Sequence, residues 1–84
     1  MPRVLPLSPR LERFIYHHQL TKIWEKQVTI FSIDPFYPSL RTELLEPKHF
    51  RLYSFRITKS YRAIFVYCGD DDVEIIDINN HYRS

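Results

Sequence analysis

The residues best suited to chemistry in this sequence are cationic and aromatic side chains in its second half. Five cations lie between positions 48 and 62 with no acidic residue among them: Lys48, Arg51, Arg56, Lys59 and Arg62. Tyr53 and Tyr61 fall inside this run, and His81 and Tyr82 follow near the end of the sequence. Arginine matches phosphate geometry with two parallel hydrogen bonds, and aromatic rings stack on unpaired bases. The combination predicts a surface that binds RNA and its phosphates.

A titratable imidazole beside these cations could move a proton near neutral pH. Cleavage of RNA needs little more, because the 2′-hydroxyl of the substrate can itself act as the nucleophile. The protein then has to supply a base, a stabiliser of negative charge and an acid. The competing interpretation of the same residues is a solvated cationic strand edge with a structural histidine.

Other catalytic patterns are missing from the sequence. It has no glycine-rich phosphate loop and no CxxC pair. His17 and His18 are adjacent and would point about 100° apart on a helix, so they cannot jointly hold one metal ion. A Ser-His-Asp arrangement has no support beyond the presence of the residue types. We therefore expect no metal and no cofactor, and any endoribonuclease activity would be metal-independent.

Length and composition predict one small folded domain that covers residues 1–84. A chain of 84 residues can bury one modest core, and its hydrophobic content of 44% favours folding over disorder. The net charge of +2 does not by itself indicate nucleic acid, so the local run of cations carries more weight. No apolar run approaches the ~20 residues of a membrane span, and the first residues lack the apolar core of a signal peptide. We expect a soluble cytoplasmic protein without membrane contact.

Three consecutive antiparallel strands are predicted around the cations, near residues 52–57, 61–68 and 73–79. Aromatic and β-branched residues dominate these strands, and the whole segment contains no proline and a single glycine, Gly69. The middle strand is apolar at both parities, which predicts a central strand buried on both faces. Cys68 would then be a small core residue in a reducing compartment.

The N-terminal half predicts an edge strand followed by two helices. The segment 3–7 is strand-like, and Pro6 confines it to a sheet edge. Ser8-Pro9 is a strong helix start, so a first helix should run to about residue 18. A second helix is expected over Thr21–Ile33, with the alternative that residues 28–33 form a strand. Residues 39–45 are ambiguous between a helical turn and a short strand.

This order, β-α-α-β-β-β, defines an α+β domain in which a helical hairpin packs on one face of a twisted antiparallel sheet. The hairpin must bury its apolar stripe against the sheet. We therefore expect Trp24 and Phe31 to pack against sheet residues such as Phe55 or Phe65.

The stretch from Leu52 to Phe65, which reads LYSFRITKSYRAIF, resembles the core of RelE/YoeB-type toxins of the RelE/ParE superfamily, from bacterial and archaeal toxin–antitoxin pairs. Those proteins carry an aromatic-and-arginine strand, a short polar turn and a second strand that opens with an aromatic residue or histidine before arginine. An acidic hairpin comes next, and the last strand here ends in INNHY, which is most similar to the YoeB branch. The resemblance covers the whole chain in element order and is close in sequence over residues 40–82.

The resemblance implies the same fold, with cleavage of mRNA in the ribosomal A site as the activity. It implies a cognate antitoxin, the ribosome and mRNA as partners. Carried over residue by residue, it implies that Arg62 contacts the scissile phosphate and that Arg56 also faces phosphate. His81 occupies the position of the proton-transferring residue, and Tyr82 that of the adjacent aromatic.

The general base is the part of the implied site with open alternatives. In the YoeB branch it is a glutamate before the main strands, and both Glu43 and Glu46 are candidates. Ser54 departs from the pattern, because RelE itself has a lysine there. The alternative function within this fold is non-catalytic: a toxin that poisons DNA gyrase, or a degenerate module that only binds its antitoxin. His81 at the terminal position favours the ribonuclease branch.

Overall fold

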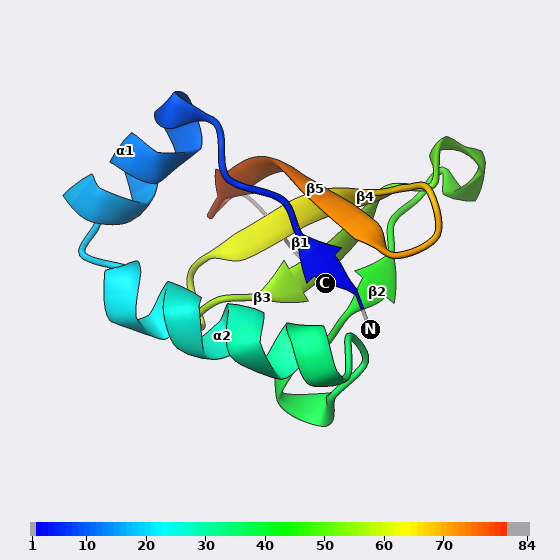
Figure 1. The fold of residues 1–84 in the computed structure, drawn as a ribbon, viewed down its shortest axis with the longest axis horizontal. Coiled ribbons are helices and arrows are strands. Elements are labelled where there is room, and N and C mark those ends of the chain that lie inside the picture. Colours follow the sequence, from blue (N-terminus) through cyan, green and yellow to red (C-terminus); the bar gives the residue numbers. More distant parts are fainter. Residues whose placement is uncertain (1, 81–84) are drawn as a thin grey trace.

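Two helices and a five-stranded sheet make up the computed structural model, which describes residues 2–80 (Figure 1). The sheet order is β1-β5-β4-β3-β2, and neighbouring strands are antiparallel except for β1 and β5. The elements are β1 (Arg3–Val4), α1 (Pro9–His17), α2 (Thr21–Ile33), the 3₁₀ turn η1 (Pro38–Leu40), β2 (Glu43–Leu44), the 3₁₀ turn η2 (Lys48–Phe50), β3 (Tyr53–Arg56), β4 (Arg62–Cys68) and β5 (Asp72–Asn79). The predicted α+β class and element order are confirmed, and the structure adds the short strand β2.

Local signals in the sequence set both helices. The Ser8 hydroxyl accepts a hydrogen bond from the Leu11 N–H at 3.3 Å, and Pro9 opens α1. Helix α2 spans the whole of Thr21–Ile33, so the alternative of a strand at residues 28–33 is wrong. Neither helix within residues 2–80 combines the length and apolarity needed to cross a bilayer.

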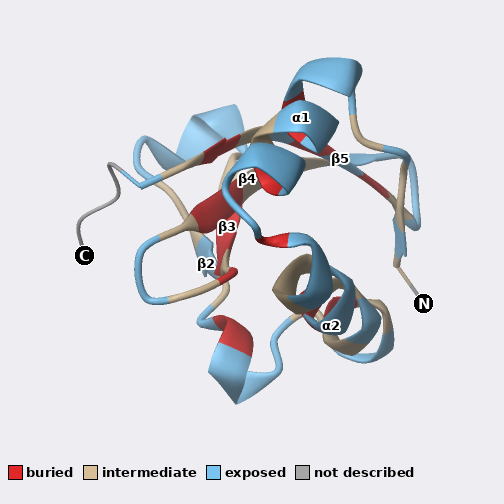
Figure 2. Ribbon diagram, turned by 90° about the vertical axis from the view of Figure 1, so that its left-hand side faces the viewer, coloured by how far each residue is buried: buried red, intermediate tan, exposed pale blue. Residues whose placement is uncertain are grey.

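The core forms where the helices cover one face of the sheet (Figure 2). The ring of Phe31 in α2 lies 4.9 Å from that of Phe55 and 5.0 Å from that of Phe65, between centroids. Trp24, two turns earlier in α2, stacks on Phe55 at 5.8 Å. The predicted aromatic contacts are therefore confirmed. Full burial of such a side chain contributes roughly 1.5–3 kcal/mol to stability.

Strand β4 is less buried than the sequence predicts. Ala63 and Phe65 are buried against the helices, whereas Val66 is half-buried and Cys68 is exposed. The reason is the length of β3, which pairs only with residues 62–65 and leaves the second half of β4 with β5 as its one neighbour. The predictions of a middle strand buried on both faces and of a core cysteine are therefore wrong.

The ambiguous segment 39–45 contains both a helical turn and a strand. Turn η1 is followed by Arg41 in the left-handed conformation, with φ at 46°, which redirects the chain into β2. The Thr42 hydroxyl donates a hydrogen bond to the carbonyl of Pro35 and so ties the start of β2 to the end of α2. This arrangement places Glu43 in a strand that pairs with β3.

Candidate functional site

The face of the sheet that the helices leave uncovered, termed the open face, carries the candidate site. Strand alternation places on it the side chains whose parity is opposite to that of the core phenylalanines. The register aligns Glu43 with Ser54, and it aligns Arg56 with Arg62. Arg62 in turn pairs with Asn79 of β5. The open face therefore gathers a carboxylate, a hydroxyl, two guanidinium groups and an amide.

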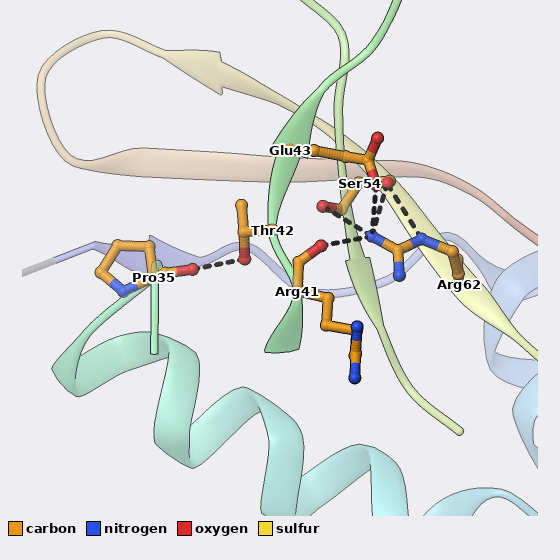
Figure 3. A network of polar contacts seen from close by, with 6 residues as sticks. All are labelled: Pro35, Arg41, Thr42, Glu43, Ser54 and Arg62. Atoms are coloured by element: carbon orange, nitrogen blue, oxygen red, sulfur yellow. Dashed lines mark hydrogen bonds and ion pairs between the residues drawn. The ribbon is translucent and has the colours of Figure 1, made fainter. Parts of the chain in front are cut away.

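Arg62 is bonded on several sides (Figure 3). Its Nε and Nη2 donate hydrogen bonds to the Ser54 Oγ at 3.1 and 2.9 Å, and Nη2 donates another to the Arg41 carbonyl at 2.6 Å. Nη2 also lies 3.7 Å from Oε2 of Glu43, whose side chain is 45% exposed. We call these four residues the Arg62 network. Arg62 itself is only 7% exposed, so it is not part of a solvated cationic strand edge.

The Arg62 network satisfies a charge that would otherwise be costly to bury. A buried guanidinium is tolerated when it is paired and its donors are hydrogen-bonded. Ser54, which is fully buried, supplies a hydroxyl that accepts hydrogen bonds from the guanidinium. Arg41, which has a left-handed backbone conformation, supplies its own backbone carbonyl as a second acceptor. These contacts hold the arginine in one orientation before any ligand arrives.

Two members of this network were not predicted as site residues. In the sequence Ser54 stands out only as a departure from the RelE pattern, although its parity with Arg56 in the same strand places the two side chains on one face. Arg41 contributes through its backbone carbonyl, and its contact with Arg62 spans 21 positions of sequence. No residue pattern in the sequence indicates such a contact, because it depends on how η1 packs against β3.

The structure separates the two candidates for the general base. Glu43 lies beside Arg62 on the open face. Glu46 comes after β2 and is exposed, and in the described part of the chain no hydrogen bond or ion pair joins it to Arg62. On geometry, Glu43 is the carboxylate that could act together with the arginine.

Two more of the predicted phosphate contacts lie near this end of the sheet. Arg56 is half-buried and directly opposite Arg62 across β3 and β4. Opposite residues of an antiparallel pair are close, with Cβ atoms about 4.5–5.5 Å apart, so two cationic side chains start from adjacent points. Lys59 is exposed in the connection between the two strands. This concentration of positive charge suits an anion such as phosphate.

Lys48 and Arg51, the other predicted phosphate contacts, lie elsewhere. Both are exposed at η2 or just after it, before β3 begins, whereas Arg56 ends that strand. Tyr67 and Arg51 line the same hollow. Partial burial raises the pKa of the Tyr67 hydroxyl, and the nearby Tyr53 raises this pKa further by a smaller amount. The structure therefore does not bring Lys48 and Arg51 to Arg62, and their contact with RNA stays a prediction.

His81 and Tyr82 lie outside the described residues, so their convergence with Arg62 stays a prediction. The last residue of β5, Asn79, pairs with Arg62. Among residues 2–80, no three side chains of the metal-binding types come together in a possible metal site. The chemistry that the described residues offer is therefore a carboxylate held next to a fixed guanidinium.

No family model matches this sequence, and no curated protein matches it. Solved structures with the same fold do exist. A YoeB/ParE toxin from Agrobacterium tumefaciens aligns over 98% of this chain and 100% of its own, with a TM-score of 0.72 and 20% identity. The heterotetrameric YoeB–YefM toxin–antitoxin complex from Staphylococcus aureus aligns over 98% of this chain and 99% of its own, with a TM-score of 0.69 and 19% identity. The fold resemblance inferred from the sequence is therefore confirmed along almost the whole chain.

Proposed function

We propose that this chain is the toxin of a toxin–antitoxin pair and that it cleaves mRNA on the ribosome. The observation that carries the proposal is the pairing of Glu43 with the fixed guanidinium of Arg62 on the open face, at 3.7 Å. The shared fold with YoeB-type toxins supports it. The substrate and the ribosome place this activity in the cytoplasm.

The proposed reaction is attack of the substrate's 2′-hydroxyl on the adjacent phosphorus. Glu43 accepts the proton from that hydroxyl as the O2′–P bond forms. The P–O5′ bond then breaks, and His81 gives a proton to the leaving 5′-oxygen. The products are a 2′,3′-cyclic phosphate and a 5′-hydroxyl. A positioned acid or base typically contributes about 10²–10⁴ in rate.

Arg62 would stabilise the additional negative charge of the pentacoordinate phosphate. Preorganised donors of this kind are worth about 2.7–4 kcal/mol each in the transition state. Arg56, on the neighbouring strand, would bind an adjacent phosphate oxygen, and Tyr82 would stack on a splayed base. Because hydrogen bonds to Ser54 and Arg41 already orient the Arg62 guanidinium, little reorganisation is needed when the phosphate arrives.

We propose a cognate antitoxin as the protein partner, with an acidic segment that covers the cations of the open face. Complementary charge speeds such association and makes it sensitive to salt. Hydrogen exchange on the co-purified complex should show protection of β3 and of the first half of β4. Protection confined to the acidic hairpin at residues 70–72 would rule out this binding surface.

The test of the nuclease is to induce Glu43→Gln and its matched control Glu46→Gln, and to map mRNA ends by primer extension. We expect Glu43→Gln to lose new mRNA ends and growth arrest, and Glu46→Gln to keep both. Growth arrest without any new mRNA ends in the unmodified protein would contradict the proposal. It would favour the non-catalytic alternative, including a gyrase-poisoning toxin.

A further inference from the structure

Three polar side chains are buried among residues 2–80: Gln27, Ser54 and Arg62. Two of them belong to the Arg62 network. The third, Gln27, lies in α2, on the side of the sheet that the helices cover, and is 7% exposed. Burying a polar side chain costs free energy unless its polar atoms find hydrogen-bond partners. The partners of Gln27 therefore indicate what an amide does at this position.

The amide of Gln27 is bonded to the end of β3. Its Nε2 donates hydrogen bonds to the carbonyl of Arg56 at 2.9 Å and to that of Ile57 at 3.3 Å. Since both partners are acceptors, they require the nitrogen of the amide, and not its oxygen, to face the strand. One side chain of α2 therefore holds the backbone of two consecutive residues, the first of which is an arginine of the candidate site.

Packing of α2 determines where that amide lies. Trp24 and Phe31 are three residues before Gln27 and four residues after it, so the three side chains share one face of the helix. Both rings pack on Phe55 of β3. Arg56 directly follows Phe55, so these aromatic contacts place the Gln27 amide beside the last residue of the strand. The position of the amide is therefore set by the core and not by the open face.

The ladder between β3 and β4 is irregular next to this contact. The Ile57 N–H donates to the Tyr61 carbonyl at 2.9 Å, whereas the Tyr61 N–H donates to the Thr58 hydroxyl at 3.2 Å in place of the return bond of a regular pair. Because bonded and non-bonded positions alternate, Arg56 is at a non-hydrogen-bonded position, and its carbonyl points away from β4. In the described part of the chain, β2 pairs with only the first two residues of β3. Within residues 2–80, Gln27 thus supplies the donor that the neighbouring strands do not.

The end of β3 has to bring two like charges together. Arg56 and Arg62 are opposite each other, and side chains come closer at a non-hydrogen-bonded position than at a bonded one. Like charges directly opposite each other destabilise a strand pair. Without a restraint, this repulsion would separate the end of β3 from β4. The Gln27 amide restrains the strand from the side of the sheet opposite to the two guanidinium groups.

We propose that Gln27 is a positioning residue of the candidate site: its amide holds the end of β3 and thereby keeps the Arg56 guanidinium where it can bind one phosphate together with Arg62. The part that this phosphate plays in cleavage rests on the proposed function, whereas the restraint rests on the hydrogen bonds of Gln27. A competing interpretation is that Gln27 only satisfies the carbonyls of a bent strand end. It would then affect stability, and its effect on the site would not depend on the Arg56 side chain.

The first test is a double-mutant cycle on mRNA cleavage by the purified protein on ribosomes, with Gln27→Met, Arg56→Gln and the double variant. Arg56→Gln should lower kcat/KM about tenfold or more, because a hydrogen bond to a charged group is worth roughly that factor. Gln27→Met, which keeps the length of the side chain, should lower it about threefold or more when Arg56 is present, as for residues that act as a unit. It should change kcat/KM less than about 1.5-fold in the Arg56→Gln protein. Losses that multiply in the double variant would overturn the proposal.

The matched control is Val28→Ala, at the next position of α2. Val28 is half-buried and lines an apolar hollow beside Trp24. Its truncation should lower the melting temperature, as large-to-small substitutions do, and leave kcat/KM of the folded protein within about twofold. Equal losses of kcat/KM in Val28→Ala and Gln27→Met would overturn the proposal. Should Gln27→Met not fold, the double variant with Arg56→Gln has to fold, because it lacks the repulsion that the amide opposes, and its failure to fold would also overturn the proposal.

The second test does not depend on cleavage. It follows the Nε–Hε NMR signal of Arg56, identified by its loss in Arg56→Gln, during titration with inorganic phosphate. Phosphate should shift this signal in the unmodified protein, and Gln27→Met should raise the apparent Kd about threefold or more. Val28→Ala should change the Kd less than about 1.5-fold. An Arg56 signal that does not respond to phosphate, or the same Kd with and without the amide, would overturn the positioning role.

The positioning role and the nuclease can therefore fail separately. A protein in which phosphate binding at Arg56 depends on Gln27, but which yields no new mRNA ends, would refute only the nuclease. A protein that cleaves mRNA equally well with and without the Gln27 amide would refute only the positioning role.

Discussion

Replacing Ser54 by alanine removes the hydroxyl at the centre of the Arg62 network. That hydroxyl accepts hydrogen bonds from Nε and Nη2 of Arg62, and Ser54 is 0% exposed, so bulk solvent does not replace it. A hydrogen bond to a charged group contributes about 1.5–3 kcal/mol net. Since Arg62 keeps the Arg41 carbonyl and Glu43 as partners, we expect a loss of one such contribution, about 1.5–3 kcal/mol.

Urea denaturation followed by circular dichroism measures this loss. A thermal melt gives a second measurement. For a domain of this size, each kcal/mol of lost unfolding free energy lowers the melting temperature by about 4–8 °C, so Ser54→Ala should melt roughly 6–24 °C below the unmodified protein. Ser39→Ala, at an exposed position of η1, should stay within about 0.5 kcal/mol. A Ser54→Ala protein as stable as this control would refute the reasoning, because the buried hydroxyl would then contribute nothing.

The double variant Arg62→Met/Ser54→Ala separates the hydrogen bonds from the buried charge. Arg62→Met alone leaves the Ser54 hydroxyl and the Arg41 carbonyl without the guanidinium. Replacing both partners of a buried polar pair by apolar groups is often neutral, so the double variant should lose less stability than the sum of the singles. The interaction energy expected from residues in direct contact is about 0.5–3 kcal/mol. Strict additivity would show that the two side chains do not act as a unit.

Three further outcomes follow from the site and the core. Arg62→Ala should abolish mRNA cleavage, whereas Arg62→Lys should keep a fraction of it, because a point charge does not reproduce the guanidinium fork; equal activity in primer extension would contradict this. His81→Gln should abolish growth arrest while leaving the melting temperature and antitoxin binding unchanged, and full toxicity of the folded variant would remove His81 from the mechanism. Phe65→Ala should cost about 3–5 kcal/mol in urea denaturation, since its ring is fully buried and touches Phe31 and Phe55; a cost below about 1 kcal/mol would mean that this core is not formed.

The helices and the long strands were predictable because their signals are local. Ser8 and Pro9 define the start of α1 from two adjacent positions, and the apolar spacing of α2 outweighs the strand-like composition of residues 28–33. The exposure of Cys68 was not predictable in the same way. It depends on how far β3 extends along β4, which is a property of two strands and not of the residues around the cysteine.

The candidate site also depends partly on local signals in the sequence and partly on contacts between distant segments. The cationic run and the resemblance to RelE/YoeB-type toxins predict Arg62 as a site residue. Its burial depends on contacts from two other segments, residues 41–43 and β3. The choice between Glu43 and Glu46 was open because a shift of three positions along the chain cannot be resolved by composition. The register of β2 against β3 places Glu43 beside Arg62, which is why we propose Glu43 as the base.

The buried position of Arg62 is consistent with a catalytic arginine and is difficult to explain by stability alone. Well-packed apolar residues often stabilise a protein as well as a buried ion pair of similar volume does. A cation at this position instead provides a charge that is oriented before the substrate binds, beside a carboxylate that is 45% exposed and opposite a second arginine. Because a preorganised charge needs no rearrangement during the reaction, the contacts that hold Arg62 in the folded protein are those that a phosphate-stabilising arginine requires.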